Sequence, residues 1–199
     1  LDSWPRDPKL TSMFMRMTDS GQKPFYASKF IKDNKLKGKM FNSWTEGGFI
    51  AFGQEPDPNT GKTPLQLFMD GRAQAAYEPT AYRMWSDIMS GGPAVYEAKV
   101  RKKAFDYKKI GTWVDTKLKG QKVWVVLMPT GQFETPFTKG LEYHPDWQVV
   151  FYNNKQKLFV DIKTPQGKKI FYGISTGETL YPDEFSRNLI MAQTGFTLG

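Results

Sequence analysis

Two polar segments follow the first two predicted strands and hold the residue types that could do chemistry. The first is Asn42–Gly48 (NSWTEGG) and the second is Asp70–Arg72 (DGR). Because the carboxyl ends of neighbouring parallel strands meet at one edge of a sheet, where ligands bind, we expect Glu46, Asp70 and Arg72 to lie close together. Two carboxylates that flank a groove can act as an acid/base pair. This edge of the sheet is therefore the candidate site.

A tryptophan and two glycines give the same edge a second interpretation, as a polar or sugar-binding pocket. Trp44 lies beside a glycine turn and offers a stacking surface, and the paired glycines indicate that a backbone or a ligand comes close. A purely structural role is also open, in which Arg72 pairs with a carboxylate and the glycine turns fix two loops. We predict a ligand site without catalytic residues at Asn42, Trp44, Glu46, Gly47, Gly48, Asp70 and Arg72.

The composition excludes several kinds of active site. The chain has no cysteine and a single histidine, His144, so thiol catalysis and cysteine-based metal sites are excluded, and neither a zinc site nor a serine–histidine triad is expected. His144 precedes a proline and indicates a turn before the next strand. The segment 61–63 (GKT) resembles the end of a phosphate-binding loop, but Pro56 stands where that motif needs glycine. No GxGxxG motif is present either, and we predict no cofactor and no metal.

The formal net charge of +8 suggests an anionic partner. The lysines are spread along the chain, with the densest groups at Lys29–Lys39, Lys99–Lys109 and Lys117–Lys122. No arginine-rich helix, zinc-finger spacing or aromatic RNA-binding signature accompanies them. Solvated helix faces account for most of these lysines, and a surface that faces anionic lipid headgroups is the second interpretation. Nucleic acid is not an expected partner.

Helices and strands alternate along most of the chain. Apolar spacing predicts helices near residues 24–34, 45–52, 79–89, 95–108, 134–143 and 183–193. It predicts strands at 39–42, 65–70, 122–128, 147–152, 157–162 and 169–173. The strand at 122–128 (KVWVVLM) is nearly all apolar, which is typical of burial on both faces of a sheet. The alternation favours a three-layer α/β fold, with a mostly parallel sheet, helices on both faces and a C-terminal antiparallel hairpin.

We divide the chain of 199 residues into three parts. Residues 1–22 are expected to form a connector or arm, 23–163 an α/β domain, and 164–199 an extension that packs on that domain. No stretch approaches the roughly 18 apolar residues that a membrane span needs, and no signal peptide is visible. Since the first residue is Leu1 and not Met, we expect a processed chain or a fragment of a longer protein. If that longer protein is membrane-bound, its anchor is expected upstream.

Three blocks in the chain resemble segments of polytopic bacterial membrane proteins similar to dolichyl-phosphate-mannose-type and oligosaccharyl-type glycosyltransferases. They are Phe30–Ile50, Leu67–Arg72 with Tyr77 after it, and Asp146–Tyr152 followed by Leu158–Val160. The blocks occur in the family's order over about residues 24 to 162. The resemblance implies a domain that follows the transmembrane helices and lies outside the cytoplasm, and it adds Tyr77 to the candidate ligand site. It also implies a lipid-linked sugar donor that the membrane part handles, with catalytic acids in loops absent from this chain.

The first functional hypothesis is therefore an extracytoplasmic, periplasmic accessory or recognition domain of a membrane-embedded glycosyltransferase-like protein. Its expected partners are the protein's own upstream transmembrane region and lipid headgroups or a glycan. The alternative is a free-standing soluble hydrolase or transferase that uses Glu46 and Asp70 as an acid/base pair.

Overall fold

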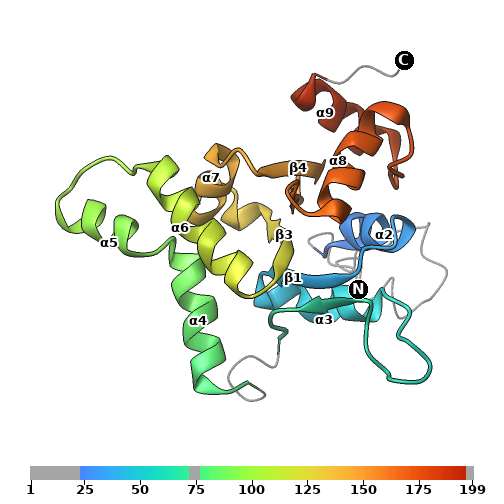
Figure 1. The fold of residues 1–199 in the computed structure, drawn as a ribbon, viewed down its shortest axis with the longest axis horizontal. Coiled ribbons are helices and arrows are strands. Elements are labelled where there is room, and N and C mark those ends of the chain that lie inside the picture. The colour runs from blue at the N-terminus through green and yellow to red at the C-terminus, as the bar shows by residue number, and fades with distance from the viewer. Residues whose placement is uncertain (1–22, 72–76, 196–199) are drawn as a thin grey trace, which may run out of the picture.

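A computed structural model describes residues 23–71 and 77–195. The described residues form a mixed α/β fold that is mostly helical, with eight α-helices and one open, five-stranded sheet (Figure 1). The strand order is β2-β1-β3-β5-β4. The predicted arm at 1–22 and the predicted site residue Arg72 lie outside the described residues.

The sheet combines a parallel half and an antiparallel half. Its strands are β1 (Gly38–Asn42), β2 (Leu65–Leu67), β3 (Val123–Pro129), β4 (Trp147–Tyr152) and β5 (Gln156–Asp161). β1 pairs in parallel with β2 and β3, whereas β5 pairs antiparallel with β3 and β4. The α/β class that the sequence predicts is confirmed. The three-layer arrangement and the C-terminal hairpin stay predictions, and two helices follow β4 and β5.

Prolines and short polar side chains begin most of the helices. Those of the described residues are α2 (Phe25–Asp33), α3 (Trp44–Phe52), α4 (Pro79–Ser90), α5 (Pro93–Val100), α6 (Tyr107–Gly120), α7 (Pro136–Tyr143), α8 (Pro165–Thr176) and α9 (Glu184–Thr194). Proline stands in the first turn of α4, α5, α7 and α8, where its missing N–H removes no helical hydrogen bond. The side chains of Asp106, Thr135, Thr164 and Asp183 cap α6, α7, α8 and α9. No helix among these residues is both long enough and apolar enough to cross a bilayer.

Two of the sequence-based element predictions are wrong. The helix expected at 95–108 is two helices, because α5 ends at Val100 and Asp106 begins α6 by accepting a hydrogen bond from Lys109 N. The strand expected at 169–173 is part of α8. Its Ile-Phe-Tyr run favours a strand, but Thr164 caps the N-terminus of a helix there, and helical spacing buries Ile170 and Ile174 on one face.

One hydrophobic core joins the sheet to the helices. Its largest fully buried side chains include Trp147 and five phenylalanines at positions 30, 41, 137, 151 and 159. Ile170, Ile174 and Ile190 of α8 and α9 belong to the same cluster. The Tyr181 hydroxyl donates to Val150 O of β4 at 2.8 Å. The segment after residue 163 thus shares the core of the preceding chain.

Helices α6 and α7 approach one another at a pair of glycines. A Cβ placed on Gly111 would lie 2.2 Å from Gly140 O, and a Cβ placed on Gly140 would lie 2.8 Å from Ile110 Cγ2. Both distances are far below van der Waals contact, so a side chain at either position forces the two helices apart. The glycine pair therefore sets the spacing between α6 and α7, on which the positions of Asp115 and His144 depend.

We predict that Gly111→Ala destabilises the protein by about 2 kcal/mol, because overpacking a close contact costs more than the helix propensity of alanine returns. Gly120→Ala is the matched control in the same helix, since a Cβ there meets nothing within 4 Å. This control should leave stability unchanged or raise it by up to about 1 kcal/mol. Urea unfolding followed by circular dichroism measures both, and equal effects of the two substitutions would show that the helices do not depend on close contact.

Candidate functional site

Asn42 holds the two predicted polar segments together at the carboxyl edge of the sheet. It is the last residue of β1 and fully buried. Its Nδ2 donates to Met69 O at 2.7 Å, and its Oδ1 accepts from Phe68 N at 3.1 Å. Its backbone oxygen accepts from Trp85 Nε1 at 2.9 Å. Asn42 therefore ties the segment after β2 to the end of β1, and its side chain is used within the fold.

The two glycines at this edge have different roles. A Cβ on Gly47 would lie 2.4 Å from Met69 O and 2.8 Å from Asp70 Cα, whereas a Cβ on Gly48 meets nothing within 4 Å. The close approach that the sequence indicates thus exists at Gly47, where the neighbour is the protein's own backbone. It brings the segment of Glu46 directly against the segment of Asp70.

Glu46 is the buried ionisable group of this edge. It lies in the first turn of α3 and is only 4% exposed. Its Oε1 accepts from Gln156 Nε2 at 3.2 Å, and its Oε2 has no hydrogen-bond partner among the described residues. Burial raises the pKa of Glu46 to about 7, against the smaller opposing effects of the Gln156 hydrogen bond and the charge of Lys23. A large fraction of Glu46 is therefore protonated near neutral pH.

The remaining predicted site residues lie nearer to solvent. Trp44, at the start of α3, is 38% exposed, and Asp70 and Tyr77 are half-buried. Asp70 N donates to the Tyr77 hydroxyl at 3.2 Å, so Tyr77 fixes the backbone of the Asp70 turn. The predicted ion pair with Arg72 lies outside the described residues. Chemically, the described part of this edge offers a buried acid, a half-buried carboxyl group and a partly exposed indole.

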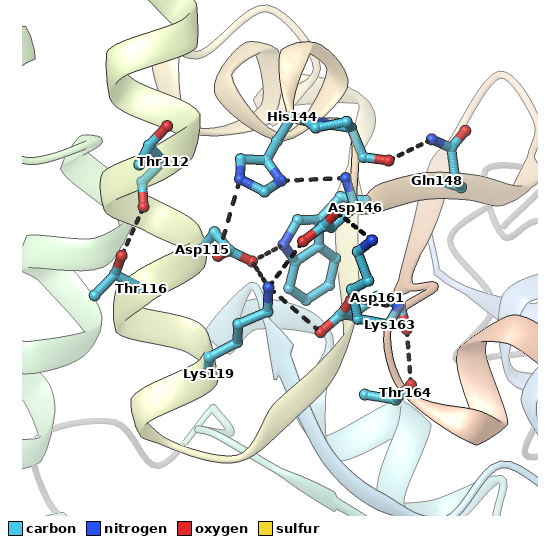
Figure 2. Close-up of polar contacts among 12 residues, drawn as sticks. Thr112, Asp115, Thr116, Lys119, His144, Asp146, Gln148, Asp161, Lys163 and Thr164 are labelled. Carbon is cyan, nitrogen blue, oxygen red and sulfur yellow. Dashed lines mark hydrogen bonds and ion pairs between the residues drawn. The ribbon is translucent and has the colours of Figure 1, made fainter.

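A second polar cluster lies at the opposite edge of the sheet, where β3 and β4 begin. We call Asp115, Lys119, His144, Asp146 and Asp161 the charge cluster (Figure 2). Lys119 Nζ lies 2.9 Å from Asp115 Oδ1, 3.1 Å from Asp146 Oδ2 and 4.0 Å from Asp161 Oδ2. One ammonium group thus faces three carboxylates, which come from α6, from the loop before β4 and from the end of β5.

Trp147 and His144 complete the hydrogen bonding of the charge cluster. Trp147 Nε1 donates to Asp115 Oδ1 at 2.8 Å. His144 Nδ1 accepts from Asp146 N at 3.3 Å, and its Nε2 lies 3.9 Å from Asp115 Oδ2. Since Nδ1 accepts a hydrogen bond, the hydrogen-bond pattern assigns the proton of the neutral imidazole to Nε2, which faces Asp115. His144 lies in the turn that the sequence predicts. Its ring also directs the proton on Nε2 toward Asp115.

The electrostatics of the charge cluster are dominated by burial and by Lys119. Burial opposes the charged form of Lys119, but the hydrogen bonds to Asp115 and Asp146 raise its pKa above the ordinary value. For Asp146, burial acts upward, and the hydrogen bond and charge of Lys119 bring the pKa below its usual range. For Asp161, burial raises the pKa and outweighs the backbone hydrogen bond from Lys163.

Three groups of the charge cluster have the residue types that bind metals. One ligand atom from each of Asp115, His144 and Asp146 lies within 4.8 Å of the others. Lys119 contacts both carboxylates directly, so a cation already lies between them and offsets part of their charge. The arrangement fits a structural ion-pair network better than a metal centre.

Sequence analysis missed this cluster because its members are far apart in the chain. The local signals are the spacing of Asp115 and Lys119, four residues apart on one helix face, and the proximity of His144 and Asp146 in the turn before β4. That helix was itself not predicted as a separate element.

Comparisons with known proteins gave no match to this chain. No protein family, curated protein or solved structure matches it. The resemblance to membrane glycosyltransferases therefore stays a prediction.

We predict that Glu46→Gln removes a pH dependence of stability. The pKa of Glu46 is about 7 in the folded protein and 4.5 as the model-compound value, so the folded state binds this proton more tightly. Its stabilising contribution is complete below about pH 4.5 and is lost as the pH rises through about 7, which amounts to about 3 kcal/mol. Relative to Glu46→Gln, the wild type should lose stability over this range, as measured by urea unfolding at a series of pH values. Glu178→Gln, at an exposed position, is the control and should change nothing; a parallel pH profile for Glu46→Gln and wild type would contradict the buried protonated acid.

We predict that Lys119→Met destabilises the protein by about 2 kcal/mol at pH 7, because three carboxylates lose their shared cation. The value is below the 3 to 5 kcal/mol typical of fully buried pairs since the Lys119 side chain is 38% exposed. Repulsion then raises the pKa values of the carboxyl groups in the folded state, so the loss should shrink as the pH falls and they become protonated. Thermal unfolding at neutral and acidic pH measures this, with Lys117→Met on the same helix as the control of smaller effect. A loss that is the same at both pH values would assign the effect to packing of the lysine stem.

Proposed function

We propose that this chain is an extracytoplasmic recognition domain of a membrane-embedded glycosyltransferase-like protein and that it does not itself catalyse sugar transfer. The observation that carries the proposal is the joint at Asn42, which binds both Met69 and Phe68. Two of the three blocks that resemble the family, 30–50 and 67–72, meet at this joint. The proposal includes the three-layer arrangement and the C-terminal hairpin that the alternation of helices and strands predicts.

The joint gives a physical reason for the residue types in those blocks. An asparagine at the end of β1 supplies one donor and one acceptor to the backbone of the segment after β2, which a hydrophobic residue or an acid could not do. A glycine at position 47 admits that backbone at a distance that no side chain allows. The requirements for asparagine at position 42 and glycine at position 47 concern the fold and not a reaction. They support a domain whose role is to hold a binding surface in place.

The surface that the joint positions lies around Trp44 and Asp70. Trp44 is exposed enough to stack against a sugar ring, and the half-buried Asp70 carboxyl group lies on the neighbouring segment. Indole rings and carboxylates are suitable partners for sugar rings and hydroxyl groups. We therefore assign recognition of a glycan or a lipid-linked sugar to this surface, with the upstream membrane region as the second partner.

One observation favours the alternative of an acid/base enzyme. A pKa of about 7 is suitable for a general acid, and Glu46 has it. The cause of this pKa is burial, however, and the same burial keeps the carboxyl group of Glu46 from a substrate. Its Oε1 is held by Gln156 of β5, so the recognition domain explains the geometry better.

The proposal predicts that the complete reading frame encodes several hydrophobic spans before Leu1. It also predicts that a periplasmic reporter fused after residue 199 is active and that a cytoplasmic reporter at that position is not. A frame without such spans, or the opposite reporter pattern, would falsify the proposal. Hydrolysis of a chromogenic glycoside by this chain, abolished in Glu46→Gln, would establish the alternative.

A further inference from the structure

The end of the molecule formed by α5 and the start of α6 concentrates positive charge. We call residues 96–109 the basic tip. Its 14 residues include six lysines and arginines and two acids, a net charge of 6 − 2 = +4, which is half of the +8 of the whole chain. Figure 1 shows α5 and the loop that follows it at the periphery of the molecule, away from the sheet. Its basic residues are Lys99, Arg101, Lys102, Lys103, Lys108 and Lys109.

The basic tip also exposes apolar side chains. Tyr96 is 73% exposed and Val100 is 64% exposed. They are four residues apart in α5, so they lie on the same face of the helix. Lys99 and Lys103 stand beside this pair in the sequence. An exposed apolar pair bordered by lysines offers both apolar and cationic contacts to a layer of anionic lipid headgroups.

Three of the six basic residues of the basic tip stand at positions that helix stability disfavours, whereas Lys99 in the last turn of α5 is favoured there by the helix dipole. Lys102 follows the C-cap of α5 and has the left-handed conformation, with φ 50°, where glycine is the favoured residue. Lys108 and Lys109 stand in the first turn of α6, where the helix dipole disfavours positive charge. Only Arg101 and Lys109 pair with an acid among the described residues, in both cases Glu97. The fold's own stability does not explain Lys102, Lys108 and Lys109, and a negatively charged partner does.

A groove of about 710 Å³ extends the basic tip onto α4 and α6. Tyr96 and Trp113 contribute apolar surface to its lining, and Arg83 and Lys117 contribute positive charge beside one acid, Asp87. Lys117 Nζ lies 5.5 Å from the centre of the Trp113 ring. Apolar and cationic groups therefore alternate across this whole side, as they do on surfaces that sit at the level of lipid headgroups.

We propose that the basic tip docks this chain on an anionic lipid bilayer, with Tyr96 and Val100 at headgroup level and the lysines on the lipid phosphates. The argument for this occupant is charge complementarity together with the exposed apolar pair, which binding to nucleic-acid phosphates would leave without a role. The inference rests on the proposed function and deepens it, since it names the surface that faces the membrane.

The first test is vesicle co-sedimentation of the whole chain. Vesicles of phosphatidylcholine with phosphatidylglycerol should bind it, and vesicles of phosphatidylcholine alone should not. Lys99→Gln, Lys102→Gln, Lys103→Gln and Lys108→Gln together should weaken binding at least about a hundredfold, since one basic residue near such a surface contributes about fivefold. The control variant removes four positive charges outside the basic tip and should change binding less than about threefold, because only basic residues near the lipid surface contribute strongly. Its substitutions are Lys35→Gln, Lys37→Gln, Lys39→Gln and Lys122→Gln. Binding should disappear at about 1 M salt, where the screening length is about 3 Å.

The second test reports where the chain meets the lipid. Because the chain has no cysteine, Tyr96→Cys and Val100→Cys each provide one site for an environment-sensitive fluorophore. On anionic vesicles, emission from both sites should rise and shift to the blue. Phe52→Cys is the matched control, since Phe52 is 68% exposed on α3, which Figure 1 shows away from α5. No emission change should occur there.

Three results would overturn the inference: no binding to anionic vesicles, equal loss of binding in the two four-lysine variants, or an emission change at position 52 but not at 96. Tighter binding to duplex DNA than to anionic vesicles would overturn it as well and would assign the basic tip to nucleic acid. Failure of the reading-frame test with intact vesicle binding would remove the proposed glycosyltransferase context and keep the lipid surface. The reverse pattern would remove only the lipid surface.

Discussion

The burial of β3 on both faces is the constraint on which the rest of the structure depends. All six residues from Val123 to Met128 are buried, and none carries an ionisable side chain. Its neighbours β1 and β5 must therefore supply hydrogen bonds along both sides, and helices must cover what remains. The two clusters described above, the edge of Glu46 and the charge cluster, lie beyond the ends of this strand, one at each edge of the sheet.

The two edges accommodate buried acids by different physical means. At the carboxyl edge, Glu46 accepts one hydrogen bond from a neutral donor, Gln156. Because the charged form is costly to bury there, the pKa of Glu46 is raised and the carboxyl group takes up a proton. At the opposite edge, Asp115 and Asp146 contact the ammonium group of Lys119, and the pKa of Asp146 is lowered. An unpaired buried charge is far costlier than a paired one. The first edge therefore responds to pH near neutrality, whereas the second responds to loss of its lysine.

The parts of the fold that could be predicted from the sequence are those with strong local signals. The apolar run of β3 and the proline and glycine that bound α4 place these elements within a residue or two of their observed ends. Gly47 was identified as a point of close approach, although its neighbour Gly48 was given the same role and has open space. The break between α5 and α6 could not be predicted, because the chain leaves α5 through a lysine in the left-handed conformation, Lys102, and not through a glycine. Such a stop has no clear signature in residue type.

The candidate site shows the same division between local and distant information. Asn42 could be placed at a strand end from the sequence, but its partners, Met69 and Phe68, are 27 and 26 residues away and depend on the parallel pairing of β1 and β2. Gln156, which holds Glu46, is 110 residues away and comes from the antiparallel half of the sheet. No pattern within a window of the sequence links these residues.

The charge of the molecule is unevenly distributed, because several acids are buried whereas the basic residues of the basic tip are exposed. Glu46, Asp115 and Asp161 are buried at the ends of the strands, so their charge is neutralised or screened within the fold. The basic residues of 96–109 lie outside the core, and only Glu97 pairs with them among the described residues. The excess of +8 is therefore presented unevenly, with half of it in the basic tip.

A protein with this distribution is oriented by an anionic surface before it makes contact, because the attraction acts over about a Debye length, 8 to 10 Å. Membrane attachment through α5 is consistent with the Trp44 surface staying free for a ligand, since α3 and α5 lie in different parts of the molecule (Figure 1).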